Sequence, residues 1–385
     1  MQLSAVSIVN ERKPVKEREN YIDNIRVLLT MLVVLHHAAV TYGASGGWYY
    51  KEEAGGLATQ LPLTIFVSVN QSFFMGLFFF LSSYFIFPSY ERKGTSRFLL
   101  DRFKRLGIPL VFYSLVISPV TIYIAIAHQH PGLSFKDYYL NREHWIETGV
   151  LWFTAALLIF TTVFILLQSV ATKKDQRAAK FPGNRSIFIF AIALGVISFF
   201  VRIVFPIGWT LPSLGFQFAH FPQYIALFII GIIAHRNQWL STLSYQQGKV
   251  WLWTAVALIV IGFPGIYILK IITHSELDAF LGGVTIQSFV NAMWEQTLGI
   301  SIMAALLSIS KYSLNKQGAF LKALSRSAYA VYIIHPLVLV CISILLKDFS
   351  IAPLLKFVIA GLLAIAVSFI VGMLLVRIPV VKDIV

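Results

Sequence analysis

The feature that most constrains this chain is the recurrence of apolar stretches of 18 residues or more. Of its 385 residues, 57% are hydrophobic and only 12% are charged. A stretch of that length and composition can cross a bilayer as an α-helix. The sequence therefore predicts an all-α fold, a polytopic integral membrane bundle of about ten transmembrane helices. With boundaries uncertain by about 2–4 residues, the predicted spans are 25–43, 63–87, 106–127, 148–170, 186–205, 216–234, 250–272, 284–309, 325–346 and 353–376.

The basic residues predict how these helices are oriented. The formal net charge is +14, which in a soluble protein would suggest nucleic acid as a partner. If the N-terminus lies inside and the spans alternate, 24 of the 31 lysines and arginines fall on inside segments and 7 on outside segments. Cytoplasmic loops of membrane proteins carry such an excess. We therefore predict a multi-pass cell-membrane protein with both termini cytoplasmic, embedded in the lipid bilayer and without a nucleic-acid partner.

No segment long enough for a soluble domain remains, so residues 1–385 are expected to form a single integral membrane domain. Residues 1–24 mix acidic with basic side chains, which is unusual for a signal peptide, and we expect a cytoplasmic N-terminal segment followed by a retained first span. The single cysteine, Cys341, excludes an intrachain disulfide. In the outer loop 43–62, Trp48, Tyr49 and Tyr50 are typical of an interfacial aromatic belt.

The first span carries an ionisable residue at two depths. Arg26 opens the span and His37 follows eleven residues later, which in a helix separates them by about 16 Å along the axis. A buried neutral imidazole is a good general base near neutral pH. The alternative is a histidine hydrogen-bonded to a backbone carbonyl or a neighbouring helix. His36 points about 100° away around the helix, so only one of the two histidines should face a given cavity.

Arg102 and Arg105 stand three residues apart at the inner mouth of the third predicted span. Residues at this spacing share one helical face, and guanidinium groups bind phosphates well. They are therefore candidates for holding an anionic ligand. The alternative is that they only set topology by the positive-inside rule, with Asp101 pairing Arg97 or Arg105.

Two further ionisable residues lie within predicted spans. Glu295 is the only carboxylate near the centre of a span, where it could orient a histidine, relay a proton or bind an acceptor hydroxyl. Its alternative role is a protonated acid bonded between helices. His335 precedes Pro336 in the ninth span, and such a proline frees a backbone carbonyl and permits a bend. His220, near the outer end of the sixth span, is a weaker candidate. The chain has no P-loop, G-x-G-x-x-G, HExxH or CxxC motif and no convincing metal spacing.

Taken together, these positions resemble the membrane acyltransferase-3 family, whose members include O-acyltransferases of glycans and related acceptors. The signatures fall in the family's order over nearly the whole chain: Asp23, Arg26 and His37; the aromatic run 78–85 with Arg102, Arg105 and Pro109; the segment 150–157; the segment 222–231; and Tyr332, His335 and Pro336. One departure is visible, because the family usually has Ser-Gly where this chain has Ser82 and Ser83.

The resemblance implies a membrane-bound acyltransferase that is not an aminoacyltransferase. It would move an acetyl, succinyl or similar group from cytoplasmic acyl-CoA to a hydroxyl of a glycan or other acceptor at or beyond the membrane, as in polysaccharide O-acetylation. Acyl-CoA would be the donor substrate, and no metal is expected. Arg26, Arg102 and Arg105 would hold its phosphates, and His37, Glu295 and His335 would form the catalytic set. The alternative function is a proton-coupled secondary transporter that relays protons through these three catalytic candidates; transporters often show internal repeats, and none is visible here. A third possible function is a non-catalytic membrane scaffold, but it would not explain why Arg26 and His37 lie in an apolar span.

Overall fold

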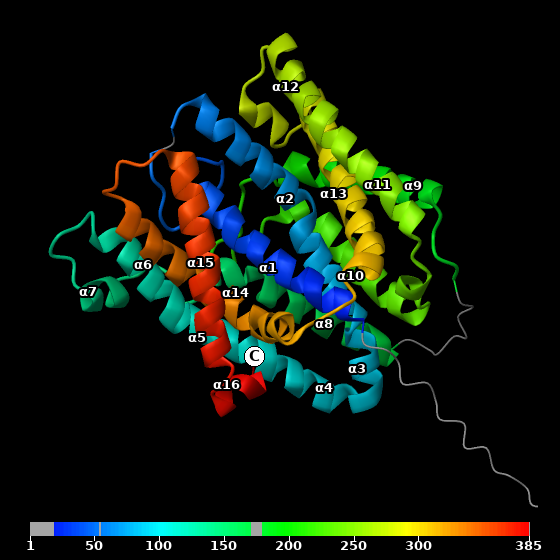
Figure 1. The fold of residues 1–385 in the computed structure, drawn as a ribbon, viewed down its shortest axis with the longest axis horizontal. Helices are drawn as coiled ribbons and strands as arrows, with labels where there is room; N and C mark the ends of the chain where they lie inside the picture. Colours follow the sequence, from blue (N-terminus) through cyan, green and yellow to red (C-terminus); the bar gives the residue numbers. More distant parts are fainter. Residues whose placement is uncertain (1–18, 54, 171–178, 385) are drawn as a thin grey trace, which may run out of the picture.

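The apolar stretches form long helices in the computed structural model, which describes residues 19–53, 55–170 and 179–384 (Figure 1). The described residues contain no β-strand, only an isolated antiparallel bridge between Leu211 and Phe216. The α-helices are α1 (Asn20–Thr41), α2 (Leu57–Tyr84), α3 (Ile86–Lys93), α4 (Thr95–Arg102), α5 (Ile108–Phe112), α6 (Ser118–Ala127), α7 (Phe135–Leu140), α8 (Trp152–Val170), α9 (Asn184–Val204), α10 (Phe221–Arg236), α11 (Tyr245–Ala257), α12 (Phe263–Ile272), α13 (Ile286–Ser313), α14 (Ala319–Leu346), α15 (Pro353–Leu375) and α16 (Pro379–Ile384).

Within the described residues, ten helical segments are long and apolar enough to cross a membrane. Each overlaps one of the ten predicted spans, so the predicted all-α bundle is confirmed. The third and seventh spans are composite, because they join α4 to α6 and α11 to α12 through π-helical turns. Most of the predicted N-terminal segment 1–24 lies outside the described residues, and α1 already begins at Asn20.

Helix α1 lies at the centre of one half of the bundle, where it packs against α2, α14 and α15 (Figure 1). Helix α13 has the corresponding position in the other half and contacts α2, α9 and α11. Its most apolar 18-residue window is 72% buried, whereas that of the α11–α12 span is only 6% buried. The α11–α12 span therefore presents its apolar side chains to the lipid, whereas α13 is largely enclosed by the other helices.

Small residues allow the central helices to approach closely. Gly299 on α13 faces the Ser72 carbonyl of α2, and Gly231 on α10 faces Phe80 and Ser83 of α2, with no room for a side chain at either glycine. Such small-residue contacts are typical of membrane helix packing. Ser83 is buried, and its hydroxyl donates to the Phe80 carbonyl at 3.0 Å. At Ser82–Ser83, where the family usually has Ser-Gly, the close approach of α2 and α10 is thus provided by Gly231 of α10.

The two ends of the bundle differ in charge. We call the end at which α1 begins the basic end, because Arg26, Arg102 and Arg236 lie in helical turns there. The segment Phe103–Gly107 beside Arg102 is π-helical, a geometry found often at functional sites. The other end, which we call the far end, carries the loop between α1 and α2.

Candidate active site

His37 and His335 meet near the far end of the bundle. His37 lies four residues before the end of α1, and His335 lies in the middle of α14. Their imidazole rings are stacked, with centroids 5.5 Å apart and planes 18° apart. Trp48, from the loop that follows α1, stacks on His37 with ring centroids 3.9 Å apart and planes 14° apart. Three aromatic rings from three separate segments therefore form one cluster.

The backbone of α14 fixes the orientation of His335. Proline has no N–H, so Pro336 cannot donate the helical hydrogen bond to the carbonyl of Tyr332, four residues earlier. His335 Nδ1 donates to that carbonyl at 2.9 Å instead. Because Nδ1 carries the proton in this bond, Nε2 of the neutral imidazole holds the free electron pair. His335 is fully buried, and its Nε2 has no hydrogen-bond partner among the described residues.

The adjacent histidines of α1 have different surroundings. His36 stacks on Phe74 with ring centroids 5.0 Å apart, and its Nδ1 accepts from Asn70 Nδ2 at 3.3 Å. His37 is partly exposed, and its Nδ1 is enclosed without a hydrogen-bond partner in the described part of the chain. The two histidines therefore face different neighbours, as expected for residues about 100° apart around the helix. His36 is bonded into the α1–α2 contact, whereas His37 faces His335 and Trp48.

Trp48 occupies a position that its sequence context did not predict. Its side chain packs over His37, a contact that the prediction of an interfacial aromatic belt did not include. The neighbouring Tyr49 is also turned inward, where its hydroxyl lies 2.8 Å from that of Tyr113. Burial raises the pKa of Tyr49, so its hydroxyl stays protonated. The only signal in the sequence for the inward packing of Trp48 and Tyr49 is the abundance of aromatic residues in this loop.

Glu295 belongs to a different cluster from the two stacked histidines. Its Oε1 accepts from Arg202 Nη2 at 2.7 Å and from His220 Nδ1 at 3.1 Å. Within the described residues, Glu295 makes no hydrogen bond or ion pair with His37 or His335. Arg202 is fully buried, and a buried charge needs a partner of this kind. Glu295 was expected to be able to orient a histidine; the histidine that it contacts directly is His220, and not His37 or His335.

Arg202 is one of the seven basic residues assigned to outside segments, and the sequence did not predict it as a site residue. A signal was present, because Arg202 is a cation in the last turn of an apolar helix and Glu295 is the one carboxylate near a span centre. Buried opposite charges are expected to pair. Which helices would meet could not be read from the sequence.

The three arginine candidates gather at the basic end. Arg26 donates to the Leu81 carbonyl at 3.4 Å and lies 4.9 Å above the Phe85 ring. Arg102 lies 5.0 Å above the Phe98 ring, within electrostatic range of Arg26 and Arg105. Asp101 pairs with Lys93 and not with the arginines named as its expected partners.

The guanidinium groups of Arg26 and Arg105 repel that of Arg102, although Arg26 also pairs with Asp23 at 3.4 Å, and a polyanionic ligand would relieve the repulsion at Arg102. This is the chemistry that phosphate groups supply. Arg105 is exposed and Arg102 is partly exposed, so both can be reached from the basic end.

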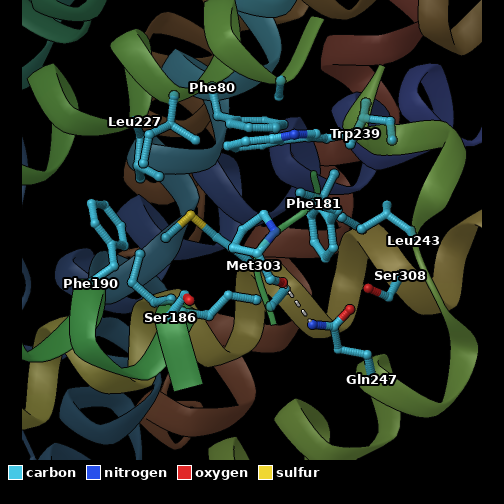
Figure 2. Close-up of a pocket in the computed structure, with 18 of the residues that line it drawn as sticks. Phe80, Phe181, Ser186, Phe190, Leu227, Trp239, Leu243, Gln247, Met303 and Ser308 are labelled. Carbon is cyan, nitrogen blue, oxygen red and sulfur yellow. Dashed lines mark hydrogen bonds between the residues drawn. The ribbon is translucent and has the colours of Figure 1, made fainter. Parts of the chain in front are cut away.

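A separate apolar pocket of about 220 Å³ lies between α2, α9, α10, α11 and α13 (Figure 2). Phe80, Phe190 and Trp239 line it, and Met303 lies among them. Gln247 donates to the Pro182 carbonyl at its edge, at 3.3 Å. Among the described lining residues there is none of the predicted catalytic or phosphate-binding side chains. The pocket can accommodate hydrocarbon, but it offers neither a base nor a cation.

No three His, Cys, Asp or Glu side chains in the described ranges are grouped to hold a metal ion. The chemistry available at the site is that of imidazole bases at one end of α1 and guanidinium groups at the other.

Comparison with known proteins identifies the family. The acyltransferase-3 family model, described as an acyltransferase domain, matches residues 19–373. The chain is 29% identical over 230 residues to the glucans biosynthesis protein C of Escherichia coli strain K12, covering 57% of this chain and 58% of that protein. The protein of the same name from Escherichia coli O17:K52:H18 is 29% identical over 239 residues, covering 59% of this chain and 60% of its own length. The chain thus spans less than two thirds of the relatives it matches. The family match covers most of the chain, confirms the resemblance seen in the sequence, and shows that this protein belongs to the acyltransferase-3 family.

Proposed function

We propose that this protein is a membrane-bound O-acyltransferase of the cell membrane. It transfers an acyl group from acyl-CoA, bound at the cytoplasmic side, to a hydroxyl of a glycan or other acceptor at or beyond the membrane. The proposal extends the family assignment to a donor, an acceptor class and an orientation. Membership of an acyltransferase family favours this function over a proton-coupled transporter.

The observation that carries the proposal is the placement of base and cations at opposite ends of one helix. The His37–His335 pair lies toward the far end of α1, and Arg26 lies near its beginning. The eleven residues between Arg26 and His37 span about 16 Å. A donor with an anionic nucleotide and a long neutral arm has the same arrangement of charge along its length. Its phosphates would contact Arg26, Arg102 and Arg105, and its thioester would lie beside the imidazole rings.

In this mechanism a histidine acts as general base. It takes the proton from the acceptor hydroxyl, the oxygen attacks the thioester carbonyl carbon, and a tetrahedral oxyanion forms. Collapse of that intermediate breaks the carbon–sulfur bond, and the CoA thiolate takes the proton back from the imidazolium. His335 Nε2 has the free electron pair that this step requires, and His37 lies beside it.

The acceptor is proposed to be a glucan or a related glycan. The support is the name shared by the Escherichia coli relatives, glucans biosynthesis protein C. The predicted orientation puts the far end on the outer side of the membrane. The acceptor would therefore approach the histidines from that side.

The test is thioester cleavage in membranes that carry the protein. Release of free CoA thiol is measured from acetyl-CoA, succinyl-CoA and a long-chain acyl-CoA, with and without a glucan oligosaccharide. We expect cleavage of at least one donor, stimulated by the oligosaccharide and abolished by His37→Ala. Absence of cleavage with every donor, at a normal level of folded protein, would overturn the proposal.

A further inference from the structure

Trp48 carries a buried hydrogen-bond donor that is not used in the packing of the described residues. The indole Nε1 is enclosed, and it has no acceptor among the residues that the structure describes. Leaving a buried polar group unsatisfied destabilises the fold. Such groups are rare, and each calls for an explanation. This one belongs to the ring that stacks on His37 at 3.9 Å and lies 6.2 Å from the ring of His335.

The three stacked rings carry both a hydrogen-bond donor and a hydrogen-bond acceptor that have no partner among the described residues. Within the described part of the chain, His37 Nδ1, His335 Nε2 and Trp48 Nε1 are all enclosed and unbonded. An indole N–H can only donate, whereas His335 Nε2 can only accept because Nδ1 carries the proton. One ligand that satisfies both must present an acceptor to Trp48 and a donor to the imidazole. A carbonyl oxygen beside a hydroxyl, the reacting groups of acyl transfer to an alcohol, meets this requirement.

The loop that carries Trp48 is held in place on both sides. Glu52 N donates to the Thr41 carbonyl at 2.9 Å, and the Glu52 carboxylate pairs with the buried Lys356 at 2.7 Å. Next to Trp48, the hydroxyls of Tyr49 and Tyr113 are bonded. A donor fixed before the reaction stabilises a developing charge without a cost of reorganisation.

We propose that Trp48 is a catalytic residue that donates its indole N–H to the carbonyl oxygen of the acyl group. As the acceptor oxygen bonds to the carbonyl carbon, the electron pair of the C=O bond moves onto the carbonyl oxygen. The indole N–H of Trp48 stabilises the oxyanion that results. When the C=O bond re-forms, the carbon–sulfur bond breaks and CoA leaves as the thiolate. This inference rests on the proposed function, since it assigns the oxyanion donor of the same reaction.

The experiment compares Trp48→Phe with wild type in purified, detergent-solubilised protein. Phenylalanine keeps an aromatic ring for the stack and removes the donor. Loss of one oxyanion donor lowers kcat by about 10²–10³-fold. We expect a loss of that size with little change in KM for acyl-CoA and in acyl-CoA binding. Trp145→Phe is the matched control, because Trp145 is a half-exposed residue of the loop between α7 and α8.

The outcomes separate this inference from the proposed function. A wild-type protein that cleaves acyl-CoA, with Trp48→Phe reduced less than about threefold, overturns the role of Trp48 and leaves the acyltransferase proposal standing. A loss in Trp48→Phe that is matched by lost folded protein or lost acyl-CoA binding also overturns it, because the ring would then act only in packing. A wild-type protein that cleaves no acyl-CoA overturns both. A loss confined to kcat, with Trp145→Phe at the wild-type rate, supports the assignment.

Discussion

His335 donates from Nδ1 to the carbonyl of Tyr332 at 2.9 Å, the carbonyl that Pro336 leaves without its helical partner. The proline therefore sets the tautomer of the histidine that follows Tyr332 by one turn. Nε2 is left as the free base, fully buried in a ring that stacks on the ring of His37. In the proposed mechanism, a proline inside a transmembrane helix would thus be a positioning residue for the base.

Replacing Pro336 should disturb this arrangement without removing any catalytic group. In Pro336→Ala the new N–H can donate to the Tyr332 carbonyl, and it competes with His335 Nδ1. Misplacement of a catalytic group by about 1 Å can cost about 10²-fold in rate. We expect acyl transfer to fall by about 10- to 100-fold while the midpoint of thermal unfolding stays the same or rises. A wild-type rate in folded Pro336→Ala protein would show that the proline does not control the base.

Glu295 is predicted to stabilise the protein through its ion pair with Arg202. Removing one partner of a buried pair costs about 3–5 kcal/mol, whereas replacing both by apolar residues is often neutral. Glu295→Leu and Arg202→Met should each lower the yield and the unfolding temperature. The double variant should recover both, measured by thermal unfolding in detergent.

The acyl-transfer rate of that double variant separates structure from catalysis. If Glu295 is structural, a folded double variant keeps most of the wild-type rate. A folded double variant that is inactive would instead place Glu295 among the residues that act in the reaction, the role predicted from the sequence.

The arginines at the basic end should bind the nucleotide part of the donor. Loss of a charge-assisted phosphate contact costs on the order of 1.5–3 kcal/mol, so Arg102→Ala and Arg105→Ala should weaken acyl-CoA binding accordingly. The exposed Arg92 provides the control substitution Arg92→Ala. With S-acyl-pantetheine, which lacks the nucleotide, the deficit should shrink. Normal acyl-CoA binding by both variants would leave these cations with a topological role alone.

The orientation of the bundle is predicted from the distribution of basic residues. Reporter fusions after Ala44, Gly132 and Gly282 should report the outside, and fusions after Lys93 and Lys174 the inside. A consistent inversion at all five positions would place the arginine cluster outside, where acyl-CoA is absent, and would contradict the proposed donor site.

The sequence predicted the ten spans because the length and apolarity of a span are local properties. It also singled out His37 and His335 as costly residues in apolar surroundings. It could not pair them, since contacts between helices depend on which spans become neighbours and how each is rotated. The pair of Arg202 with Glu295, separated by 93 residues, was missed for this reason. The contact of Trp48 with His37 could not be predicted, because a loop residue gives no periodic signal of burial.

The central claim is that an imidazole of the His37–His335 pair is the general base. The most direct test is the rate of acyl transfer by His37→Ala and His335→Ala beside His36→Ala, at equal amounts of folded protein and with acyl-CoA binding measured for all three. Loss of a general base costs about 10²–10⁴ in rate. We predict such a loss for His37→Ala with acyl-CoA binding retained, and a milder effect for His36→Ala, because His36 is bonded to Asn70 on another face. Near wild-type rates in both His37→Ala and His335→Ala would contradict the mechanism, and equal losses at His36 and His37 would indicate packing instead.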